Sequence, residues 1–330
     1  MNRHSEKMQP EVDVIVLNYN SGDLLRRTLP TVLETKYPEY NVIVVDNGSN
    51  DQSVDWVVDT FGDRVKLIKL DKNYGCAGGL NRAIPYINGK YVALLNEDII
   101  PDKNWLTEAV NILEKTPKAG MVLSSLIKPD KKTIEGTSGW FSKKYCIFGQ
   151  NKTDIEKDTL TTHAGMGSVL VRSDLLREFK IEEKYFLYYE GIDLSLRMWL
   201  SGYEIVACPK SILYHFHRGS VNRNFKNHEI DRLVVRNNLL VFLRFYPLKW
   251  ILLYMPTYLW DRGIIFSGRL MRRELLRAIA IPMGLIDGIL EWKWIIQMRS
   301  KTPNKERIEE VLNKLDKLGV KEKCAWRIGL

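Results

Sequence analysis

The first 116 residues alternate between short apolar runs and amphipathic stretches. Four runs rich in Val, Ile and Leu have the length of strands and are bounded by turn residues; they cover residues 12–20, 41–51, 64–70 and 91–100. The stretches that follow have apolar residues at helical spacing; they cover residues 21–35, 51–62, 74–87 and 102–116. Strand and helix alternating four times predict an α/β fold, with a mostly parallel sheet covered by helices on both faces.

The pattern changes after residue 120. Residues 121–127 are apolar, and a polar stretch follows over 128–162. The sequence then predicts a short strand over 165–179, a helix within 185–203, and a pair of strands over 204–220.

Polar side chains stand where three of the four predicted strands end. Asn18 and Asn20 close the first strand, Asp46 closes the second, and Asn96 and Asp98 close the fourth. The carboxyl ends of parallel strands meet at one edge of a sheet, and ligands bind α/β sheets at that edge. The sequence therefore predicts a ligand site there.

Asn96 and Asp98, in LLNEDII, are candidates for holding a cation. A carboxylate at a strand end before a tight turn can bind Mg²⁺ or Mn²⁺ while the metal keeps waters and bridges phosphates. Side chains alternate along a strand, so we expect Glu97 to point away from these two residues. The alternative is a strand terminus that is simply solvated.

The segment NYGCAGGLN, residues 73–81, is a glycine-rich turn that leads into a helix. It matches neither the dinucleotide-binding pattern G-x-G-x-x-G nor the phosphate-binding pattern G-x-x-x-x-G-K-S/T. Its glycines either let the backbone approach a ligand or let the helix pack closely on the sheet, and the sequence leaves both open.

Two further clusters carry candidate chemistry. Glu190 and Asp193 stand three apart at a predicted helix start, where they are either a general base or acids favoured by the helix dipole. His215 and His217 lie on one face of a predicted strand and suggest a metal or phosphate contact. No other His or Cys is near enough in sequence for a closed zinc site, so Asp98 is the candidate partner in space.

From about residue 231 the chain is helical in pattern, aromatic and basic. Residues 236–330 hold 18 Lys and Arg against nine Asp and Glu, which accounts for the net charge of +9. The apolar runs there are too short for a spanning helix, which needs about 20 residues. Trp, Tyr and cations around aliphatic residues are typical of helices at a membrane surface, and a helical packing region is the alternative. A nucleic-acid surface would be more polar and striped with Arg, so we expect no nucleic-acid partner.

The cysteines and the N-terminus agree with a reducing compartment. The four cysteines are scattered, without a C-x-x-C pair, which argues against a disulfide framework or a zinc knuckle. The first residues are polar, and we expect no signal peptide.

In this order, the segments resemble the inverting family 2 glycosyltransferases, most of all the bacterial and archaeal branch that transfers rhamnose and similar sugars. The matching stretches run from residue 12 to about 220: VIVLNYN, VIVVDNGSNDQS, NYGCAGGLNRAI, LLNEDIIPDKNWL, GMGSVLVRSDLL, YYEGIDLSLRMWLSGY and YHFHRGS. The resemblance implies a GT-A fold, Rossmann-like with a mostly parallel sheet flanked by helices. We expect this catalytic domain over residues 1–225 and a helical, basic and aromatic, membrane-associating extension over 226–330.

The resemblance also implies site residues, a nucleoside-diphosphate sugar donor, and Mg²⁺ or Mn²⁺. By motif position, Asn18 and Asn20 lie by the nucleotide and Asp46 hydrogen-bonds the base. Asp98 binds the metal, with Asn96 in an N-x-D form of the family's D-x-D motif, and His215 is preferred to His217 as a metal or diphosphate ligand. The nucleotide-sugar pocket is lined by Asn73, Gly78, Gly79 and Asn81.

One position departs from the family pattern. The family has Glu-Asp where this chain has Glu190-Gly191, and the Asp of that pair is the expected base. Gly191 cannot accept a proton, so Glu190 first and Asp193 second are the candidates to replace it. Otherwise the enzyme is slow, uses another base, or is a noncatalytic relative.

We therefore expect an inverting, metal-dependent hexosyltransferase. It moves a rhamnose-like or other hexose from a dTDP or UDP donor to a hydroxyl of a glycan or lipid-linked saccharide, in the assembly of cell-surface polysaccharide. The expected location is cytoplasmic, peripheral at the inner face of the cell membrane, and dimerisation through the basic tail is left open. The rivals are a noncatalytic sugar-nucleotide or glycan-binding relative, a nucleic-acid-associated protein, and a nucleotidyltransferase, which would want a cationic glycine-rich loop near the N-terminus.

Overall fold

The computed structural model describes residues 9–216 and 224–318. The described strands are β1 Val12–Asn18, β2 Tyr40–Asp46, β3 Lys66–Lys69, β4 Tyr91–Asn96, β5 Ile99–Pro101, β6 Ala119–Ile127, β7 Ile134–Gly136, β8 Ser138–Ser142, β9 Ile147–Asn151, β10 Thr159–Leu160, β11 Ser168–Arg172 and β12 Glu204–His215. The described α-helices are α1 Gly22–Val32, α2 Ser53–Phe61, α3 Gly75–Ala83, α4 Trp105–Lys115, α5 Ser173–Phe179, α6 Glu190–Leu200, α8 Asn227–Phe245, α9 Leu248–Met271, α10 Leu275–Leu290, α11 Trp292–Lys301 and α12 Ile308–Leu318.

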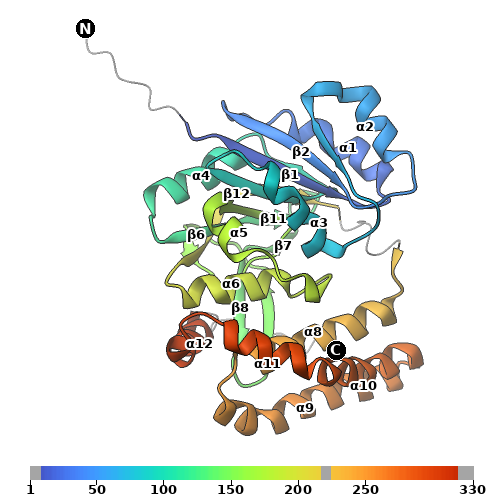
Figure 1. The fold of residues 1–330 in the computed structure, drawn as a ribbon, viewed down its shortest axis with the longest axis vertical. Helices are drawn as coiled ribbons and strands as arrows, with labels where there is room; N and C mark the ends of the chain where they lie inside the picture. The colour runs from blue at the N-terminus through green and yellow to red at the C-terminus, as the bar shows by residue number, and fades with distance from the viewer. Residues whose placement is uncertain (1–8, 217–223, 319–330) are drawn as a thin grey trace.

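Most of the strands form one mixed sheet in the order β10-β12-β6-β11-β4-β1-β2-β3, with β5 beside β12 and β7 beside β6 (Figure 1). β1, β2, β3 and β4 are mutually parallel, as the alternation of strand and helix predicts. β11 runs antiparallel between β4 and β6, and β12 lies parallel to β6. The predicted α/β class with a C-terminal helical region is confirmed.

Each central strand buries both faces, in two separate cores. On β1, Val14 and Val16 belong to the cluster that includes residues of α1 and α4, whereas Ile15 and Leu17 belong to the cluster that includes residues of α3, α6 and α8. Side chains alternate across a strand, so a run without polar positions must be covered on both sides. This requirement explains why helices lie on both faces of the sheet (Figure 1).

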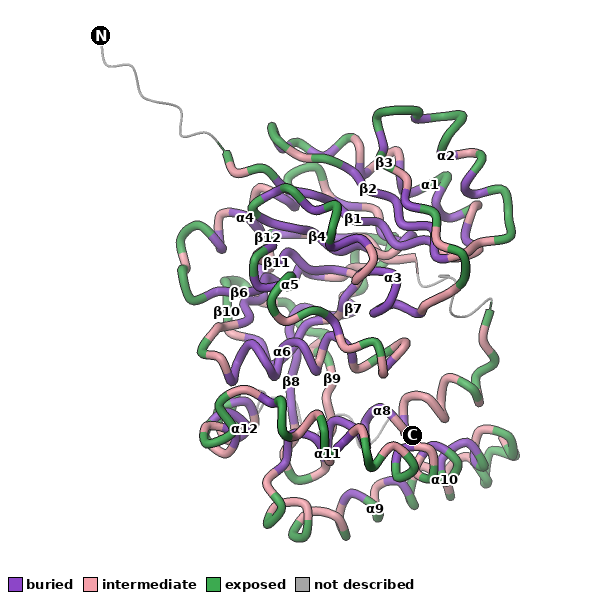
Figure 2. Tube along the Cα trace, viewed as in Figure 1, coloured by how far each residue is buried: buried purple, intermediate pink, exposed green. Residues whose placement is uncertain are grey.

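The helices from α8 to α12 form a layer against the sheet domain, beyond α6 and the β8–β9 hairpin (Figure 1). α10 packs closely on α8 because it presents glycines: a Cβ added at Gly284 would lie 2.5 Å from the carbonyl oxygen of Arg232. A Cβ at Gly288 would lie 2.8 Å from the side chain of Leu239. The outward sides of α9 and α10 are largely exposed (Figure 2). Among the described residues, no helix is both long and apolar enough to cross a membrane.

The β8–β9 hairpin was not predicted, and strand β12 differs from the prediction. The polar stretch 128–162 contains the β8–β9 hairpin, whose Trp140 and Phe141 are buried. The predicted pair of strands over 204–220 is wrong, because β12 is one strand that shifts register against β6 between Cys208 and Ile212.

The three cysteines among the described residues, Cys76, Cys146 and Cys208, are buried and free. Cys324 lies outside the described part of the chain.

Candidate active site

The polar ends of β1, β2 and β4 meet at one edge of the sheet. In the register of the parallel strands, Asn18 stands opposite Asp46, and Leu17 stands opposite Asn96. The buried Asn18 Nδ2 donates to Asp46 Oδ1 at 3.0 Å, and Asp46 Oδ2 accepts from the backbone N–H of Ser49 at 3.1 Å. This pair joins β1 to the turn after β2.

Beyond this edge lies a cleft of about 370 Å³. The residues predicted from sequence that line it are Asn73, Asn96, Asp98, Glu190 and His215. The others stand around it without forming its wall: Asn18, Asn20, Asp46, Gly78, Gly79, Asn81 and Asp193. Residues from segments more than 100 positions apart in the chain therefore share one cleft.

Asp98 and His215 are brought together by strand pairing. β5 follows the turn at Glu97 and Asp98 and pairs with β12, so that Ile99 stands opposite His215. His215 Nε2 lies 3.3 Å from Asp98 Oδ2, while His215 Nδ1 lies 2.9 Å from Glu135 Oε2. Burial opposes the charge on His215, but the hydrogen bonds and charges of Asp98 and Glu135 outweigh it and raise its pKa. His217 lies outside the described residues.

Asp98 has a second oxygen in a different situation. Its Oδ1 is buried, and no group among the described residues hydrogen-bonds to it. A buried carboxylate oxygen without a partner is costly unless a cation or a donor satisfies it. Glu135, which was not predicted, comes from the polar stretch 128–162 and reaches this place through β7 beside β6.

Glu97 does not behave as expected from alternation. β4 ends at Asn96, so the two-residue period stops there, and Glu97 shares the cleft wall with Asn96 and Asp98. Its Oε1 accepts from Ser21 Oγ at 3.1 Å, and its carbonyl oxygen accepts from Thr28 Oγ1 at 2.7 Å. Glu97 therefore joins the turn to α1.

The glycine-rich segment uses its glycines for close packing. A Cβ added at Gly79 would lie 2.7 Å from Leu17 Cδ1, and one at Gly78 would lie 2.7 Å from Tyr74 Cβ. Asn73 lines the cleft, and its Oδ1 accepts from Asn47 Nδ2 at 3.0 Å and from Gly75 N–H at 2.8 Å. Of the two roles that the sequence left open, the geometry gives close packing to Gly78 and Gly79.

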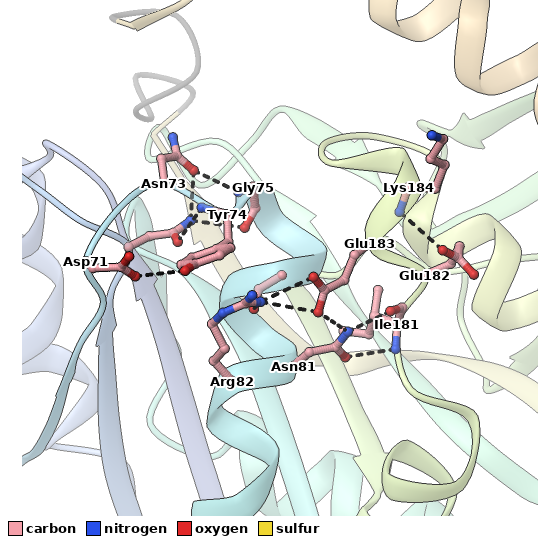
Figure 3. Close-up of polar contacts among 12 residues, drawn as sticks. Asp71, Asn73, Tyr74, Gly75, Asn81, Arg82, Ile181, Glu182, Glu183 and Lys184 are labelled. Atoms are coloured by element: carbon pink, nitrogen blue, oxygen red, sulfur yellow. Dashed lines mark hydrogen bonds and ion pairs between the residues drawn. The ribbon is translucent and has the colours of Figure 1, made fainter. Parts of the chain in front are cut away.

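The end of α3 is joined to the segment before α6 by a polar network (Figure 3). The side chain of Asn81 makes two hydrogen bonds with the backbone of Ile181. Asn81 Nδ2 donates to the Ile181 carbonyl at 2.7 Å, and Asn81 Oδ1 accepts from the Ile181 N–H at 2.9 Å. Arg82 pairs with Glu183 at 3.2 Å and stacks over the ring of Tyr74 (Figure 3). Asn81 thus supports the cleft from outside.

A strained aromatic loop leads from this network into α6. Phe186, Tyr188 and Tyr189 have φ of 61°, 63° and 70°. Leu187 N–H donates to the carbonyl of Tyr185 at 2.6 Å, which makes Phe186 the centre of a γ-turn with positive φ. Such backbone conformations cost about 1–3 kcal/mol each and persist only where surrounding contacts hold them.

Gly75 holds one side of this loop. It has φ of +73°, and a Cβ there would lie 2.2 Å from the carbonyl oxygen of Phe186. The next residue, Cys76, donates its N–H to that same oxygen at 2.7 Å. The chain needs glycine at 75 because both the backbone conformation and the close approach exclude a side chain.

Glu190 is the first residue of α6 and lines the cleft. Its side chain is buried, and Oε2 has no hydrogen-bond partner among the described residues. Burial raises the pKa of Glu190 to about 7, against the opposing effects of its own backbone N–H and the Cys76 thiol. A carboxyl group with this pKa can both hold and release a proton near neutral pH.

Asp193 has a different environment, although it is one helical turn away. It is fully buried, and Arg197 Nε donates to its Oδ2 at 2.7 Å. Arg244 of α8 donates to Oδ1, which also accepts from the Tyr185 hydroxyl at 3.1 Å. Both oxygens are occupied, so the structure does not bring Asp193 into the cleft.

Gly191 is closely packed as well. A Cβ at this position would lie 2.3 Å from the carbonyl oxygen of Ala164. No side chain fits at 191 while the segment around Ala164 keeps this position.

Comparison with known proteins adds a family and a fold. Residues 13–178, about half of the chain, match the family model described as Glycosyl transferase family 2. Poly-beta-1,6-N-acetyl-D-glucosamine synthase of Staphylococcus epidermidis is 25% identical over 215 residues, which are 64% of this chain and 51% of that protein. The putative teichuronic acid biosynthesis glycosyltransferase TuaG of Bacillus subtilis is 33% identical over 92 residues, 27% of this chain and 36% of that protein. The chain thus spans about half, or less, of the length of these curated relatives.

Two solved structures resemble the whole chain. GalNAc-T7 with UDP, GalNAc and Mn²⁺ has a TM-score of 0.62 at 14% identity, covering 98% of this chain and 58% of that one. The mannosyltransferase PcManGT from Pyrobaculum calidifontis, with GDP-Man and Mn²⁺, has a TM-score of 0.54 at 17% identity, covering 93% and 87%. At these identities the likeness supports the fold alone, which is GT-A-like.

The fixed approach of Gly75 to Phe186 can be tested by a matched pair of substitutions. Gly62 also has positive φ, 49°, but nothing lies within 4 Å of a Cβ placed there. Gly62→Ala should lower the free energy of unfolding by about 1 kcal/mol, for backbone strain alone. Gly75→Ala adds a collision with backbone, and should lower it by about 3 kcal/mol or more in urea titrations. Equal losses for the two variants would contradict the packing described for residue 75.

The different environments of the two acids predict opposite effects on stability. Asp193→Asn leaves two buried guanidinium groups underpaired and should lower the free energy of unfolding by about 3–5 kcal/mol.

Glu190→Gln removes a carboxylate whose pKa rises from 4.5 in the unfolded chain to about 7 in the fold. Ionisation of that group opposes folding progressively between these two values, so the glutamine variant should gain on the wild type as the pH rises from 5 to 8, by on the order of 2 kcal/mol. Urea titrations at pH 5, 6, 7 and 8 measure this gap, and a gap that stays constant with pH would contradict the assignment.

Proposed function

The chain belongs to glycosyl transferase family 2, and on this premise we propose that it transfers a sugar from a nucleoside-diphosphate donor to a hydroxyl group, with inversion at the anomeric carbon. The observation that carries the proposal is that Asp98, with an unpartnered buried oxygen, and Glu190, with a raised pKa, line the same cleft. The Asp98 carboxylate is suited to binding a cation, and the Glu190 carboxylate is suited to accepting a proton. Displacement of a diphosphate by a hydroxyl needs both.

The residues present fit a divalent cation. Asp98 offers its unpartnered Oδ1, and His215 faces it through Nε2. His215 contacts Glu135 through its other ring nitrogen, an arrangement that fixes the orientation and tautomer of metal-binding histidines. Among the described residues, no three His, Cys, Asp or Glu side chains are arranged to hold a metal ion by themselves. The phosphates of the sugar donor and water molecules would therefore complete the coordination. We propose Asp98 and His215 as ligands, with Asn96 beside them. A bound Mg²⁺ or Mn²⁺ would stabilise the charge of the leaving diphosphate.

Glu190 is proposed as the general base. A carboxyl group with a pKa of about 7 is close to the value at which a base is both available and effective at neutral pH. It accepts the proton of the acceptor hydroxyl as that oxygen attacks the anomeric carbon and the bond to the diphosphate breaks. Asp193, whose two oxygens are bonded to Arg197, Arg244 and Tyr185, fixes the first turn of α6 instead.

The donor is proposed to lie across the ends of β1, β2 and β4. Asn18, Asn20 and Asp46 would then lie by the nucleotide, and Asn73 would line the sugar pocket. Gly78, Gly79 and Asn81 would shape that pocket through packing and through the network to residue 181. Phe186 and Tyr188 line the same cleft and offer apolar faces to a sugar ring.

The nucleotide and the sugar of the donor are proposed as classes of compound. A dTDP or UDP donor and a rhamnose-like or other hexose follow from the sequence resemblance. TarS of S. aureus, solved in complex with UDP-GlcNAc, has a TM-score of 0.51 to this chain. The names of the curated relatives refer to a poly-N-acetylglucosamine and to teichuronic acid, which supports a role in surface polysaccharide assembly. A noncatalytic binding relative is the alternative, motivated by Gly191.

Transfer assays with UDP- and dTDP-sugars, with Mn²⁺ or Mg²⁺ and glycan acceptors, test this function. Glu190→Gln should lower kcat by about 10²–10⁴-fold with donor binding retained, because only proton transfer is lost. Asp98→Asn should weaken metal-dependent donor binding. Glu178→Gln, an exposed acid on α5 outside the cleft, is the control and should match the wild type. Metal-dependent nucleotide binding that Asp98→Asn weakens, with no turnover of any donor and acceptor pair, would favour the noncatalytic alternative.

The acceptor is proposed to be lipid-linked, because the described part of the C-terminal region, residues 226–318, carries a surface suited to a membrane. Nearly all the large apolar side chains that are exposed within the described residues lie on α9, α10 and the first turns of α11; they are Leu248, Leu252, Leu253, Leu259, Trp260, Ile264, Leu270, Met271, Leu275, Leu276, Ile279, Met283, Ile286, Ile289, Leu290, Trp292 and Ile296. We call this set the α9–α11 apolar face. Soluble proteins rarely expose so many large apolar side chains in one region without a partner.

The charges around this face favour an anionic lipid surface over a second copy of the chain. The four acidic residues of α9–α11 are each in an ion pair with Lys or Arg; they are Asp261, Glu274, Asp287 and Glu291. Arg272, Arg273 and Lys293 are exposed, with no ion pair among the described residues. Unpaired cations at both ends of an apolar face attract lipid phosphates and repel an identical surface.

Flotation with vesicles tests the membrane proposal. The protein should bind vesicles that contain anionic lipid more tightly than neutral ones, and added salt should weaken the binding. Ile279→Glu, in the α9–α11 apolar face, should weaken binding about tenfold or more. Val58→Glu changes an exposed valine on α2 and should leave binding unchanged. A concentration-dependent dimer that Ile279→Glu dissociates, without vesicle binding, would instead identify a second copy as the occupant.

A further inference from the structure

The aromatic loop before Glu190 is held on its second side by one buried side chain of α8. Asn237 is fully buried, and its Nδ2 lies within hydrogen-bond distance of three carbonyl oxygens of the loop. It donates toward the carbonyl oxygens of Tyr185 at 2.9 Å, Leu187 at 2.9 Å and Tyr188 at 3.0 Å. Its neighbour Arg236 donates to the carbonyl of Lys184 at 2.9 Å.

Three carbonyl groups converge on one amide because of the loop's backbone conformation. The positive φ values of Phe186, Tyr188 and Tyr189 turn the peptide groups so that carbonyls of residues 185, 187 and 188 point toward α8. Carbonyls buried without a donor oppose folding of that conformation. Asn is suited to this position because its amide supplies two N–H groups and carries no charge. An Asp carboxylate would face the carbonyl oxygens of the loop without a hydrogen to donate.

The loop is thereby fixed between two elements that are far apart in the sequence. α3 holds it through Cys76 N–H on the Phe186 carbonyl, and α8 holds it through Asn237. Tyr189, the last residue of the loop, is the N-cap of α6, which begins at Glu190. The position of the Glu190 carboxyl group therefore depends on the loop conformation.

We infer that Asn237 is a positioning residue for Glu190: its amide holds residues 185–188 in the strained conformation that places the base in the cleft. This inference rests on the proposed role of Glu190. It also means that α8, in the helical region, is part of what makes the cleft competent, so that this region does more than attach the chain to a surface.

The chain offers a matched control one residue further along α8. Asn238 is also fully buried, and its Nδ2 donates to the carbonyl of Cys146, between β8 and β9, at 2.7 Å. Asn237→Ala and Asn238→Ala each remove a buried amide from the same helix. They differ in which part of the loop the lost hydrogen bonds reach. Asn237 bonds three carbonyl groups of the loop backbone, whereas Asn238 contacts the loop only through the side-chain hydroxyl of Tyr189.

The kinetic test is a double-mutant cycle with Glu190→Gln. Asn237→Ala should lower kcat about tenfold or more, because the base is misplaced. The cycle is read in kcat and not in the KM for the donor, because Phe186 and Tyr188 of the same loop also line the cleft. In the Glu190→Gln background the same change should have almost no further effect, since no base remains to be positioned. Asn238→Ala should leave kcat near that of the wild type, even if it lowers the melting temperature as much as Asn237→Ala does. Additive losses in the cycle, or an equal loss of kcat in Asn238→Ala, would overturn the inference.

Hydrogen exchange measured by mass spectrometry tests the contact without any reaction. Amides in the peptide covering residues 184–193 should exchange about tenfold faster or more in Asn237→Ala than in the wild type or in Asn238→Ala. Unchanged exchange would show that Asn237 does not hold the loop. If Glu190→Gln keeps the wild-type rate of transfer, the base assignment fails and the positioning role falls with it. In that case the exchange data still decide whether the loop is held by Asn237.

Discussion

The parallel register of β1 with β2 and β4 is the constraint on which the rest of the molecule depends. It puts the carboxyl ends of three strands at one edge of the sheet. The strand register alone therefore brings Asn18, Asp46 and Asn96 together there. Parallel pairing also demands crossover helices, and these cover both faces of the sheet. The later segments are added to this frame: β12 runs along β6 and carries His215 to the turn after β4.

Much of this frame could be predicted because hydrophobic period and turn residues act locally. The four parallel strands, their helices and a cleft at their carboxyl ends follow from such patterns, and so does the helical region after residue 226. Apart from the approach of Asp98 to His215, contacts set by tertiary pairing were not predicted. Glu135 meets His215 only because β7 lies beside β6, and the β8–β9 hairpin is built from a stretch with mostly polar residues.

The two acids of α6 show the same limit within four residues. Sequence spacing places Glu190 and Asp193 on one side of the first turn, and both suited a base. What separates them is the partner that each meets. Arg244 comes from α8, 51 positions further along the chain, and occupies Asp193, whereas nothing described bonds to Oε2 of Glu190. The difference between an acid held by two arginines and one with an unpartnered oxygen lies in neighbours that no local pattern specifies.

The close contact between Gly191 and the carbonyl of Ala164 limits what protein engineering can place at this position. A Cβ at residue 191 would meet that oxygen at 2.3 Å. An acid introduced at 191 therefore requires the 164–166 segment to move, so a change in that segment has to come before it. The choice of side chain at the start of α6 is in this way tied to the shape of a neighbouring loop.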